Sequence, residues 1–174
     1  MGRVKKRQKI LELFFEEPNR RFHIREISRI TKIPKTTAER IVKLLANEKL
    51  VVVDRETVFP SYTANLENFF YKAEKRNSMT DKIVLSGLID YLEKELAPKC
   101  IIVFGSVAKG EYARESDIDI FVQSHSRQIR LEKYEKQIHH RINIFFEPNI
   151  SKLSGELLNN VANGFKLKGF LKIK

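Results

Sequence analysis

The chain has 174 residues, 42% of them hydrophobic, and a formal net charge of +11. This length suits one large domain or two small ones, and the hydrophobic content is too high for a disordered tail. No apolar run approaches the ~18 residues that a membrane span needs. The N-terminus is basic and then apolar, but it has glutamates and no small-residue cleavage site, which indicates a helix and not a signal peptide. The single cysteine, Cys100, excludes an internal disulfide and favours a reducing cytoplasm.

The positive charge is unevenly distributed along the chain. Residues 1–60 contain 15 Lys and Arg against 8 Asp and Glu, residues 61–98 contain 5 against 6, and residues 99–174 contain 13 against 8. A basic first third followed by a neutral middle indicates a polyanion-binding module joined to a second unit.

The first sixty residues read as three short helices and a hairpin. The run VKKRQKILELFF has helical spacing and ends before Pro18, and FHIREISRIT predicts a second helix. In the third segment Thr36 and Glu39 form a T-x-x-E capping box, which predicts a helix start. An apolar stripe with helical spacing then predicts the buried face of this helix, at Ala38, Ile41, Val42 and Leu45. The run LVVVDRETVFPSYTA predicts a hairpin with Asp54, Arg55 and Glu56 in its turn.

Three helices followed by a hairpin predict a winged helix-turn-helix, and residues 3–63 resemble the winged-helix domains of archaeal and bacterial regulators. Such a domain places its third helix in the major groove of double-stranded DNA and its hairpin alongside as a wing. The expected contacts to bases and phosphates are Lys35, Thr36, Thr37, Arg40, Lys43 and Arg55. The alternative is a winged helix used only for protein contacts, with these side chains as an ordinary solvated face.

Residues 64–97 are expected to connect two domains through helices. The first helix is expected over about 65–76, where RNSMTD interrupts it and Ser78 or Thr80 can cap the next one. The second helix carries a leucine stripe and ends at Pro98. The aromatic residues at 69–71 favour packing between domains or in a homodimer over a ligand site.

The most informative stretch is FGSVAKGEYARESDIDIFV, residues 104–122. A buried strand, CIIVF, precedes Gly105 and Ser106, and a second strand carries Asp117 and Asp119. Side chains alternate faces along a strand, so these two carboxylates lie on one face, ~7 Å apart. Two like charges are costly to bury unless a cation joins them, and Mg²⁺ binds carboxylates together with substrate phosphates. The glycine–serine turn offers backbone N–H groups to a phosphate, so the stretch predicts a site for nucleotidyl transfer.

Gly105-Ser106, ten residues and then Asp117-Ile118-Asp119 resemble the signature of the DNA polymerase β-like nucleotidyltransferases, in particular the minimal nucleotidyltransferases of archaea and bacteria. The resemblance covers about residues 98–170. It implies a short mixed sheet with helices on one side, and Mg²⁺ or Mn²⁺ bound by the two aspartates. The residues expected to bind ATP or another NTP are Gly105, Ser106, Lys109, Arg114 and Ser116.

The chain departs from the family at the third carboxylate, which lies on a later strand. The matching run is RINIFFE, where Asn143 stands in register and Glu147 lies near the strand end. An asparagine ligates a metal through its carbonyl oxygen, but it brings no charge and cannot act as a general base. The predicted catalytic set is therefore Asp117, Asp119 and Asn143, in which Asn143 cannot activate the attacking hydroxyl. The basic tail, GFKLKGFLKIK, predicts an edge strand protected by lysines.

The sequence therefore predicts an α+β protein with a winged helix at 1–63, connecting helices at 64–97 and a nucleotidyltransferase domain at 98–174. The first hypothesis is transfer of AMP from ATP to a hydroxyl of a partner protein, with the winged helix bound to an operator. Members of the resembled family often pair with a HEPN-domain toxin as its antitoxin, and some modify a tyrosine of that toxin. The alternatives are a DNA-binding regulator with a catalytically degenerate nucleotide-binding domain, and a transferase acting on RNA ends.

Overall fold

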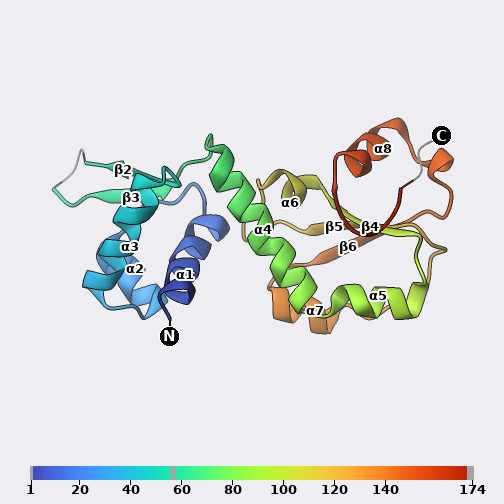
Figure 1. Ribbon diagram of the computed structural model, residues 1–174, viewed down its shortest axis with the longest axis horizontal. Coiled ribbons are helices and arrows are strands. Elements are labelled where there is room, and N and C mark those ends of the chain that lie inside the picture. Colours follow the sequence, from blue (N-terminus) through green and yellow to red (C-terminus); the bar gives the residue numbers. More distant parts are fainter. Residues whose placement is uncertain (1, 56–57, 172–174) are drawn as a thin grey trace. The chain divides into compact units, whose positions relative to one another are not determined.

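The computed structural model describes residues 2–55 and 58–171, and the chain divides into two compact units, Met1–Glu74 and Lys75–Lys174. The division falls inside one helix, α4 (Phe69–Leu85), and within the segment 64–97 that the sequence assigns to connecting helices. Figure 1 shows the elements of both units. Both units combine helices with a β-sheet, which confirms the predicted α+β class.

Unit 1 contains three helices and a three-stranded antiparallel sheet. The helices are α1 (Arg3–Glu16), α2 (Ile24–Thr31) and α3 (Lys35–Asn47). The strands are β1 (Phe22–His23), β2 (Val51–Asp54) and β3 (Ser61–Ala64), in the order β1-β3-β2. The predicted stripe of α3 is buried, which confirms the face that packs against the rest of the unit. In Figure 1 the β2–β3 hairpin extends beyond α3.

Three local predictions for unit 1 need correction. Phe22 belongs to β1, where it pairs with Tyr62, because a short apolar run fits a strand as well as a helix. The capping box is absent, since α3 begins after Pro34 and the Glu39 carboxylate pairs with Lys43 at 2.9 Å. The hairpin is confirmed, but Asp54 lies within β2, and Glu56 lies outside the described residues.

The first turns of α4 pack against α1 within unit 1. The Tyr71 hydroxyl donates to the Phe14 carbonyl at 2.7 Å, and the Tyr71 ring lies edge-on to Phe15. In a longer helix the amide of residue 18 would donate to Phe14, but Pro18 has no N–H. Tyr71 therefore supplies the donor that the sequence of α1 lacks. Arg7 donates to both carboxylate oxygens of Glu74 at 2.9 Å, which adds a second link between the two helices.

The predicted break at RNSMTD is wrong, because α4 continues through it to Leu85. The Thr80 hydroxyl donates to the Arg76 carbonyl one turn earlier, so the polar side chain is satisfied inside the helix. The chain bends at Gly87 instead, whose φ of 79° suits glycine. Helix α5 (Leu88–Leu96) follows and buries Leu88 and Leu92.

Unit 2 is built on a four-stranded mixed sheet in the order β6-β5-β4-β7. Strand β4 (Cys100–Phe104) lies in the middle and pairs antiparallel with both β5 (Ile118–Val122) and β7 (Phe165–Gly169). Strand β6 (Ile142–Phe146) pairs parallel to β5. The predicted lysine-bearing edge strand is therefore confirmed as β7. Burial raises the pKa of the Cys100 thiol, which agrees with a packing role for this residue.

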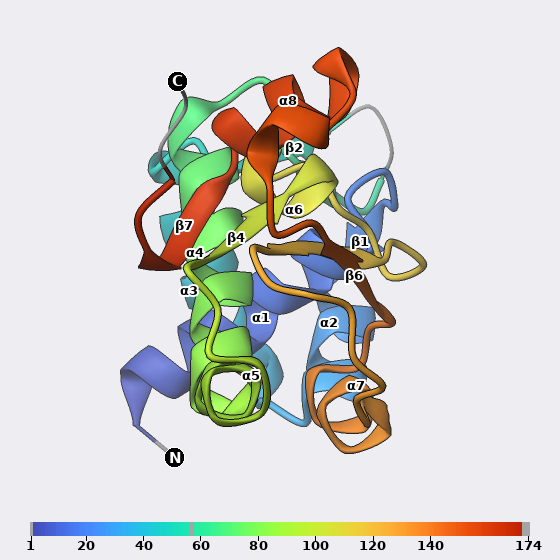
Figure 2. The same cartoon turned by 90° about the vertical axis from the view of Figure 1, so that its right-hand side faces the viewer.

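Helices cover both faces of this sheet. The helices between the strands of this sheet are α6 (Gly105–Lys109), α7 (Glu132–Ile138) and α8 (Gly155–Ala162). A 3₁₀ turn at Ile150–Lys152 precedes α8. Val161 of α8 packs on Ile102, Phe104 and Phe121. Helices α5 and α7 lie on the opposite face, as Figures 1 and 2 show, and Tyr91 stacks on Tyr134 between them. The expectation of helices on one side only is therefore wrong.

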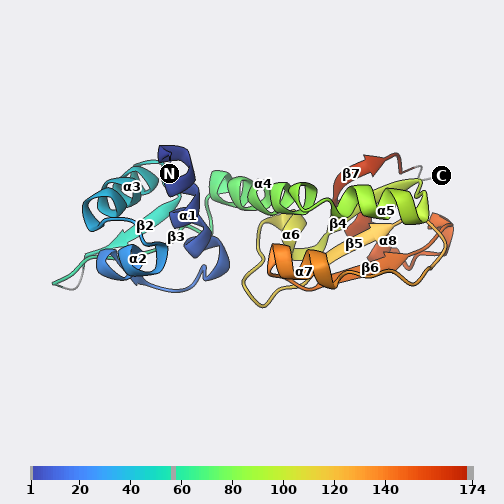
Figure 3. The same cartoon turned by 90° about the horizontal axis from the view of Figure 1, so that it is seen from below.

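Seen from below, α5 and α7 lie in front of the sheet of unit 2 (Figure 3). Among the residues that the structure describes, no helix is both long enough and apolar enough to cross a membrane.

The Tyr71 bond yields a test of the α1–α4 packing. Tyr71→Phe is expected to lower the free energy of unfolding by about 1–2 kcal/mol, because it leaves the buried Phe14 carbonyl without a donor. Burial raises the pKa of Tyr71 in the folded state. The neutral hydroxyl therefore contributes its full stability at any pH below the ordinary pKa of tyrosine. This stability is lost as the pH rises through the higher pKa of the folded state. Denaturant titration at neutral pH measures the loss.

Tyr91→Phe is the matched control, since its hydroxyl accepts from the exposed Arg130 amide, which water can satisfy. An equal loss of unfolding free energy in the two variants would show that the Tyr71 hydrogen bond contributes no more to stability than an exposed one.

Candidate functional site

The two aspartates lie at the start of β5, as the alternation predicts. Asp119 pairs with Phe104 of β4 on one side and with Asn143 of β6 on the other. Both carboxylates are partly exposed, whereas Ile118 and Ile120 are fully buried on the opposite face. The strand therefore fixes the two carboxylates at the edge of the core, where solutes can reach them.

Gly105 lies directly against Asp119. A Cβ atom built on Gly105 would stand 2.6 Å from Asp119 Oδ2, and the φ of Gly105 is 69°. Any side chain would therefore collide with the carboxylate and strain the backbone. Glycine is required here because the turn from β4 into α6 passes within contact distance of the acidic pair.

Asn143 joins the two carboxylates. Its Nδ2 donates to Asp117 Oδ2 at 3.1 Å and to Asp119 Oδ1 at 3.2 Å. No lysine or arginine among the described residues forms a salt bridge with either aspartate. The two like charges are thus held together by one neutral amide donor, and three residues from adjacent strands converge on one point.

The donor set fits a divalent cation of the Mg²⁺ type. Mg²⁺ takes oxygen ligands and is commonly held by one or two carboxylates, with waters and substrate phosphates completing the shell. Asp117 and Asp119 provide the carboxylates, and the Asn143 amide carries an oxygen next to its donating nitrogen. Within the described residues no group of three or more His, Cys, Asp and Glu side chains could hold a metal. The two carboxylates match the number that a protein commonly contributes to a Mg²⁺ site.

A chain of contacts positions the loop before Asp117. The ammonium of buried Lys75 lies 4.6 Å from the centre of the Tyr112 ring, and the Tyr112 hydroxyl donates to the Lys75 carbonyl at 3.3 Å. Tyr112 lies edge-on to His140, whose Nδ1 donates to the Ser116 carbonyl at 2.8 Å. Sequence reasoning missed Lys75 and Tyr112.

The other residues predicted to bind nucleotide differ in position. Ser106 follows Gly105 at the start of α6 and is partly exposed, and Lys109 at the end of that helix is exposed. Arg114 is exposed in the loop between α6 and β5. The Ser116 hydroxyl accepts from the Ala113 amide at 2.9 Å, so it shapes the loop.

Glu147, the other residue of the β6 region expected near the site, lies away from Asp117, Asp119 and Asn143. Its Oε1 accepts from the Asn149 amide at 2.9 Å, and it follows β6 on the chain. Among the described residues of β6, Asn143 is the one whose side chain contacts the aspartates.

Unit 1 presents a second candidate surface on α3. Lys35, Thr36, Arg40 and Lys43 are exposed and Thr37 is half-buried. Arg55 is exposed directly after β2. The Glu39 carboxylate pairs with Lys43, which raises the pKa of Lys43 and offsets part of the positive charge of this face.

Residues 86–161 match the family model described as Polymerase beta, Nucleotidyltransferase. The match begins at the bend before α5 and ends in α8, so it includes Gly105, both aspartates and Asn143. It supports a polymerase beta-like nucleotidyltransferase domain within unit 2, and it leaves unit 1 uncovered. No curated protein and no solved structure matches the chain.

The contact between Gly105 and Asp119 can be tested directly. Gly105→Ala is expected to lower the free energy of unfolding by about 1–2 kcal/mol, because the new methyl group meets Asp119 Oδ2 and the positive φ is unfavourable for alanine. Thermal unfolding monitored by circular dichroism measures the effect.

Gly155→Ala is the matched control, because a Cβ there meets no atom within 4 Å at the start of α8. That variant should be neutral or slightly stabilising. Indistinguishable unfolding of the two variants would contradict the close approach of Gly105 to the carboxylate.

Proposed function

We propose that the protein is a metal-dependent nucleotidyltransferase that moves a nucleoside monophosphate, AMP from ATP in the first instance, onto a hydroxyl of a partner protein. The observation that carries the proposal is the convergence of Asp117, Asp119 and Asn143 beside Gly105. The family match over residues 86–161 supports the same chemistry.

Each residue of the site has a distinct part in this reaction. Asp117 and Asp119 bind the cation that accompanies the triphosphate, and Gly105 lets the turn approach the phosphates closely. Ser106 offers its hydroxyl and backbone N–H to a phosphate oxygen, while Lys109 and Arg114 supply positive charge near the site. Bound Mg²⁺ or Mn²⁺ neutralises charge on the phosphates as the reaction proceeds.

The bonds exchanged are those of an in-line displacement at phosphorus. The acceptor oxygen bonds to the α-phosphorus, the bond from that phosphorus to the bridging oxygen breaks, and pyrophosphate leaves with the electron pair. The hydroxyl proton passes to solvent, because the Asn143 amide is not a base. Transfer is therefore expected to be slow compared with an enzyme that has a carboxylate at this position.

The same asparagine favours a second candidate function. A domain that binds a nucleotide at the aspartates without chemistry would serve as a sensor within a DNA-binding regulator. Asn143 suits this role because it offsets the repulsion between the aspartates without adding a third charge. A transferase acting on RNA ends is distinguished from the first proposal by where the label appears.

Unit 1 is proposed to be a winged helix-turn-helix that binds double-stranded operator DNA. Its three helices, its β2–β3 hairpin and the exposed basic residues of α3 support this assignment. In that arrangement α3 enters the major groove and Arg55 contacts the backbone beside it. An antitoxin-like role next to a HEPN-type toxin, with that toxin as the acceptor, agrees with both activities in one chain.

Transfer is tested by incubating the purified chain with ATP labelled at the α-phosphate, Mg²⁺ or Mn²⁺, and separate protein and RNA fractions of a cell lysate. We expect label on protein. Asp119→Asn should abolish it, since the variant keeps the shape of the side chain and removes its charge. Asn143→Asp should raise the rate by about 10²-fold or more, the lower range for a general base.

Asp81→Asn, an exposed site on α4, is the matched control and should label as the natural chain does. ATP binding without label above the Asp119→Asn background would favour the sensor over the transferase. Label on RNA alone would replace the protein acceptor with an RNA end.

DNA binding is tested with a duplex from the region upstream of the chain's own gene. Log affinity should fall linearly with log salt concentration, and Arg40→Ala should weaken binding and reduce that slope by about one. Fluorescence anisotropy over a salt series gives both values.

Arg130→Ala is the matched control, because this exposed arginine belongs to unit 2. Binding at background level in low salt would retire the DNA assignment and favour protein contact by unit 1.

A further inference from the structure

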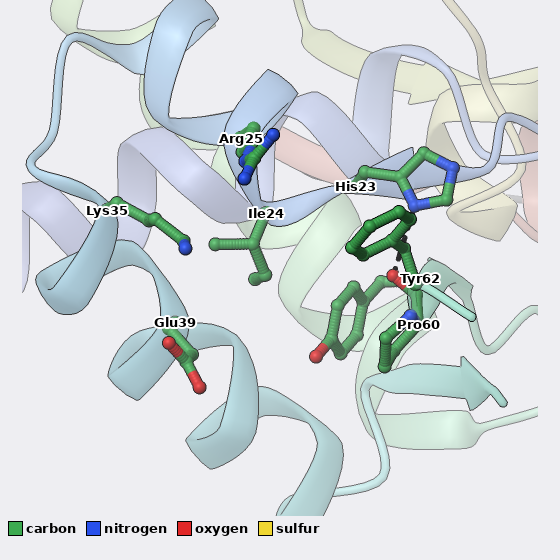
Figure 4. A pocket seen from close by; sticks show the side chains of 8 residues that line it. His23, Ile24, Arg25, Lys35, Glu39, Pro60 and Tyr62 are labelled. Atoms are coloured by element: carbon green, nitrogen blue, oxygen red, sulfur yellow. Dashed lines mark hydrogen bonds between the residues drawn. The ribbon is translucent and has the colours of Figure 1, made fainter.

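Unit 1 contains a pocket of about 430 Å³ between the start of α2, the start of α3 and the entry to β3. Its size falls within the range of ~300–1,000 Å³ typical of small-molecule sites. Eight residues line it, namely His23, Ile24, Arg25, Lys35, Glu39, Phe59, Pro60 and Tyr62. Figure 4 shows the Lys35 side chain reaching from α3 toward Ile24, with Tyr62 and Pro60 across the pocket.

One wall of the pocket is apolar and largely aromatic. Ile24, Phe59, Pro60 and the Tyr62 ring form it. His23 Nδ1 donates to the Pro60 carbonyl at 3.1 Å, which joins the two strand ends that frame this wall. Tyr62 is only 6% exposed, so its ring is held in place by the sheet. Phe59 is 67% exposed, so its ring offers apolar surface to a flat group of a ligand.

The rim of the pocket is cationic. Among the described residues, neither the Arg25 guanidinium nor the Lys35 ammonium has a salt bridge or hydrogen bond within the protein. The carboxylate that opposes them, Glu39, is engaged by Lys43 at 2.9 Å, and this bond is the main cause of its lowered pKa. Lys35 also lies close enough to Glu39 for its charge to lower the pKa of that carboxyl further. Two cations thus line the pocket against one carboxylate, and this balance favours an anionic group.

We propose that this pocket binds a small aromatic anion, with its ring on the Phe59–Tyr62 wall and its charged group between Arg25 and Lys35. A nucleoside monophosphate and an aryl carboxylate share this chemistry. The ligand binds unit 1 independently of the acidic pair and requires no metal ion.

Occupation of the pocket also affects the α3 surface. Lys35 is among the residues proposed to contact DNA, so a ligand that engages its ammonium withdraws it from a phosphate of the duplex. This consequence rests on the proposed DNA binding, whereas binding of the ligand itself does not. In the full chain the ligand is expected to lower the affinity for duplex DNA several-fold.

The proposal is tested by isothermal titration calorimetry of the full chain in EDTA. The probes are AMP and 2-naphthoate, with adenosine, 2-naphthamide and inorganic phosphate as partial ligands. We expect one site per chain for at least one of the two aromatic anions, and the ratio of their affinities identifies the preferred charged group. The uncharged partners and phosphate alone should bind at least tenfold more weakly.

Arg25→Gln should weaken the anionic probe roughly tenfold, the size expected for one charge-assisted hydrogen bond. Arg29→Gln, one turn further along α2 and exposed, is the matched control and should leave the affinity unchanged. Thermal unfolding of both variants checks that they fold. Phe59→Ala should weaken the aromatic anions while leaving the weak binding of phosphate unchanged.

Three results would overturn the proposal: no binding of either aromatic anion, equal loss in Arg25→Gln and Arg29→Gln, or phosphate binding as tightly as the aromatic probes. Retention of binding in Asp119→Asn supports the pocket in unit 1. Loss in that variant would place the ligand at the aspartates and contradict the pocket. If the aromatic anion binds but the chain does not bind DNA, the pocket proposal is supported and only the DNA-binding proposal is contradicted.

Discussion

Repulsion between Asp117 and Asp119 is the constraint around which unit 2 is organised. Strand alternation places both carboxylates on one face, and no change in the pairing of neighbouring strands can separate two residues that lie two positions apart on the same strand. The structure offsets this repulsion with a single amide, Asn143, supplied in register by the parallel neighbour β6. Gly105 then determines how closely the adjoining turn approaches, because even a methyl group would displace the Asp119 carboxylate. Strand pairing and the backbone turn at Gly105 therefore place the residues of this site, and their side chains then form the hydrogen bonds.

The packing of unit 2 extends this control to the loop that delivers Asp117. Buried Lys75 and Tyr112 hold one another from α4 and from the loop after α6. Through His140, which contacts the Tyr112 ring and donates to the Ser116 carbonyl, the start of β6 and the start of β5 are joined. The loop next to the candidate site is therefore anchored to buried side chains. These contacts position the start of β5, where the two aspartates lie.

Sequence reasoning recovered those features that depend on short-range pattern. The alternation in DIDIFV placed Asp117 and Asp119 correctly, and register with Asn143 was anticipated from the run RINIFFE. It failed where tertiary contacts override local preference. RNSMTD resembles a helix break, yet α4 continues through it with Met79 and Ile83 fully buried, and Gly87 follows the end of that helix. The pocket in unit 1 could not be predicted from the sequence either, because the residues that line it come from separate segments that meet only in the folded chain.

Asn143 has opposite consequences for the two proposed roles of this site, cation binding and nucleotidyl transfer. A third carboxylate would increase the repulsion among the acids whenever the cation is away, and the chain would lose stability in that state. Asn143 removes this cost, since its amide donates to both acids and keeps them at a fixed spacing. In the proposed transfer reaction, an asparagine at this position also leaves the acceptor hydroxyl without a carboxylate base. Within the proposed function, Asn143 is therefore compatible with cation binding and unfavourable for activation of the acceptor. In the proposed transferase, the amide must yield its hydrogen bonds or turn its oxygen inward when the cation enters, so occupancy of the site changes the link between β5 and β6.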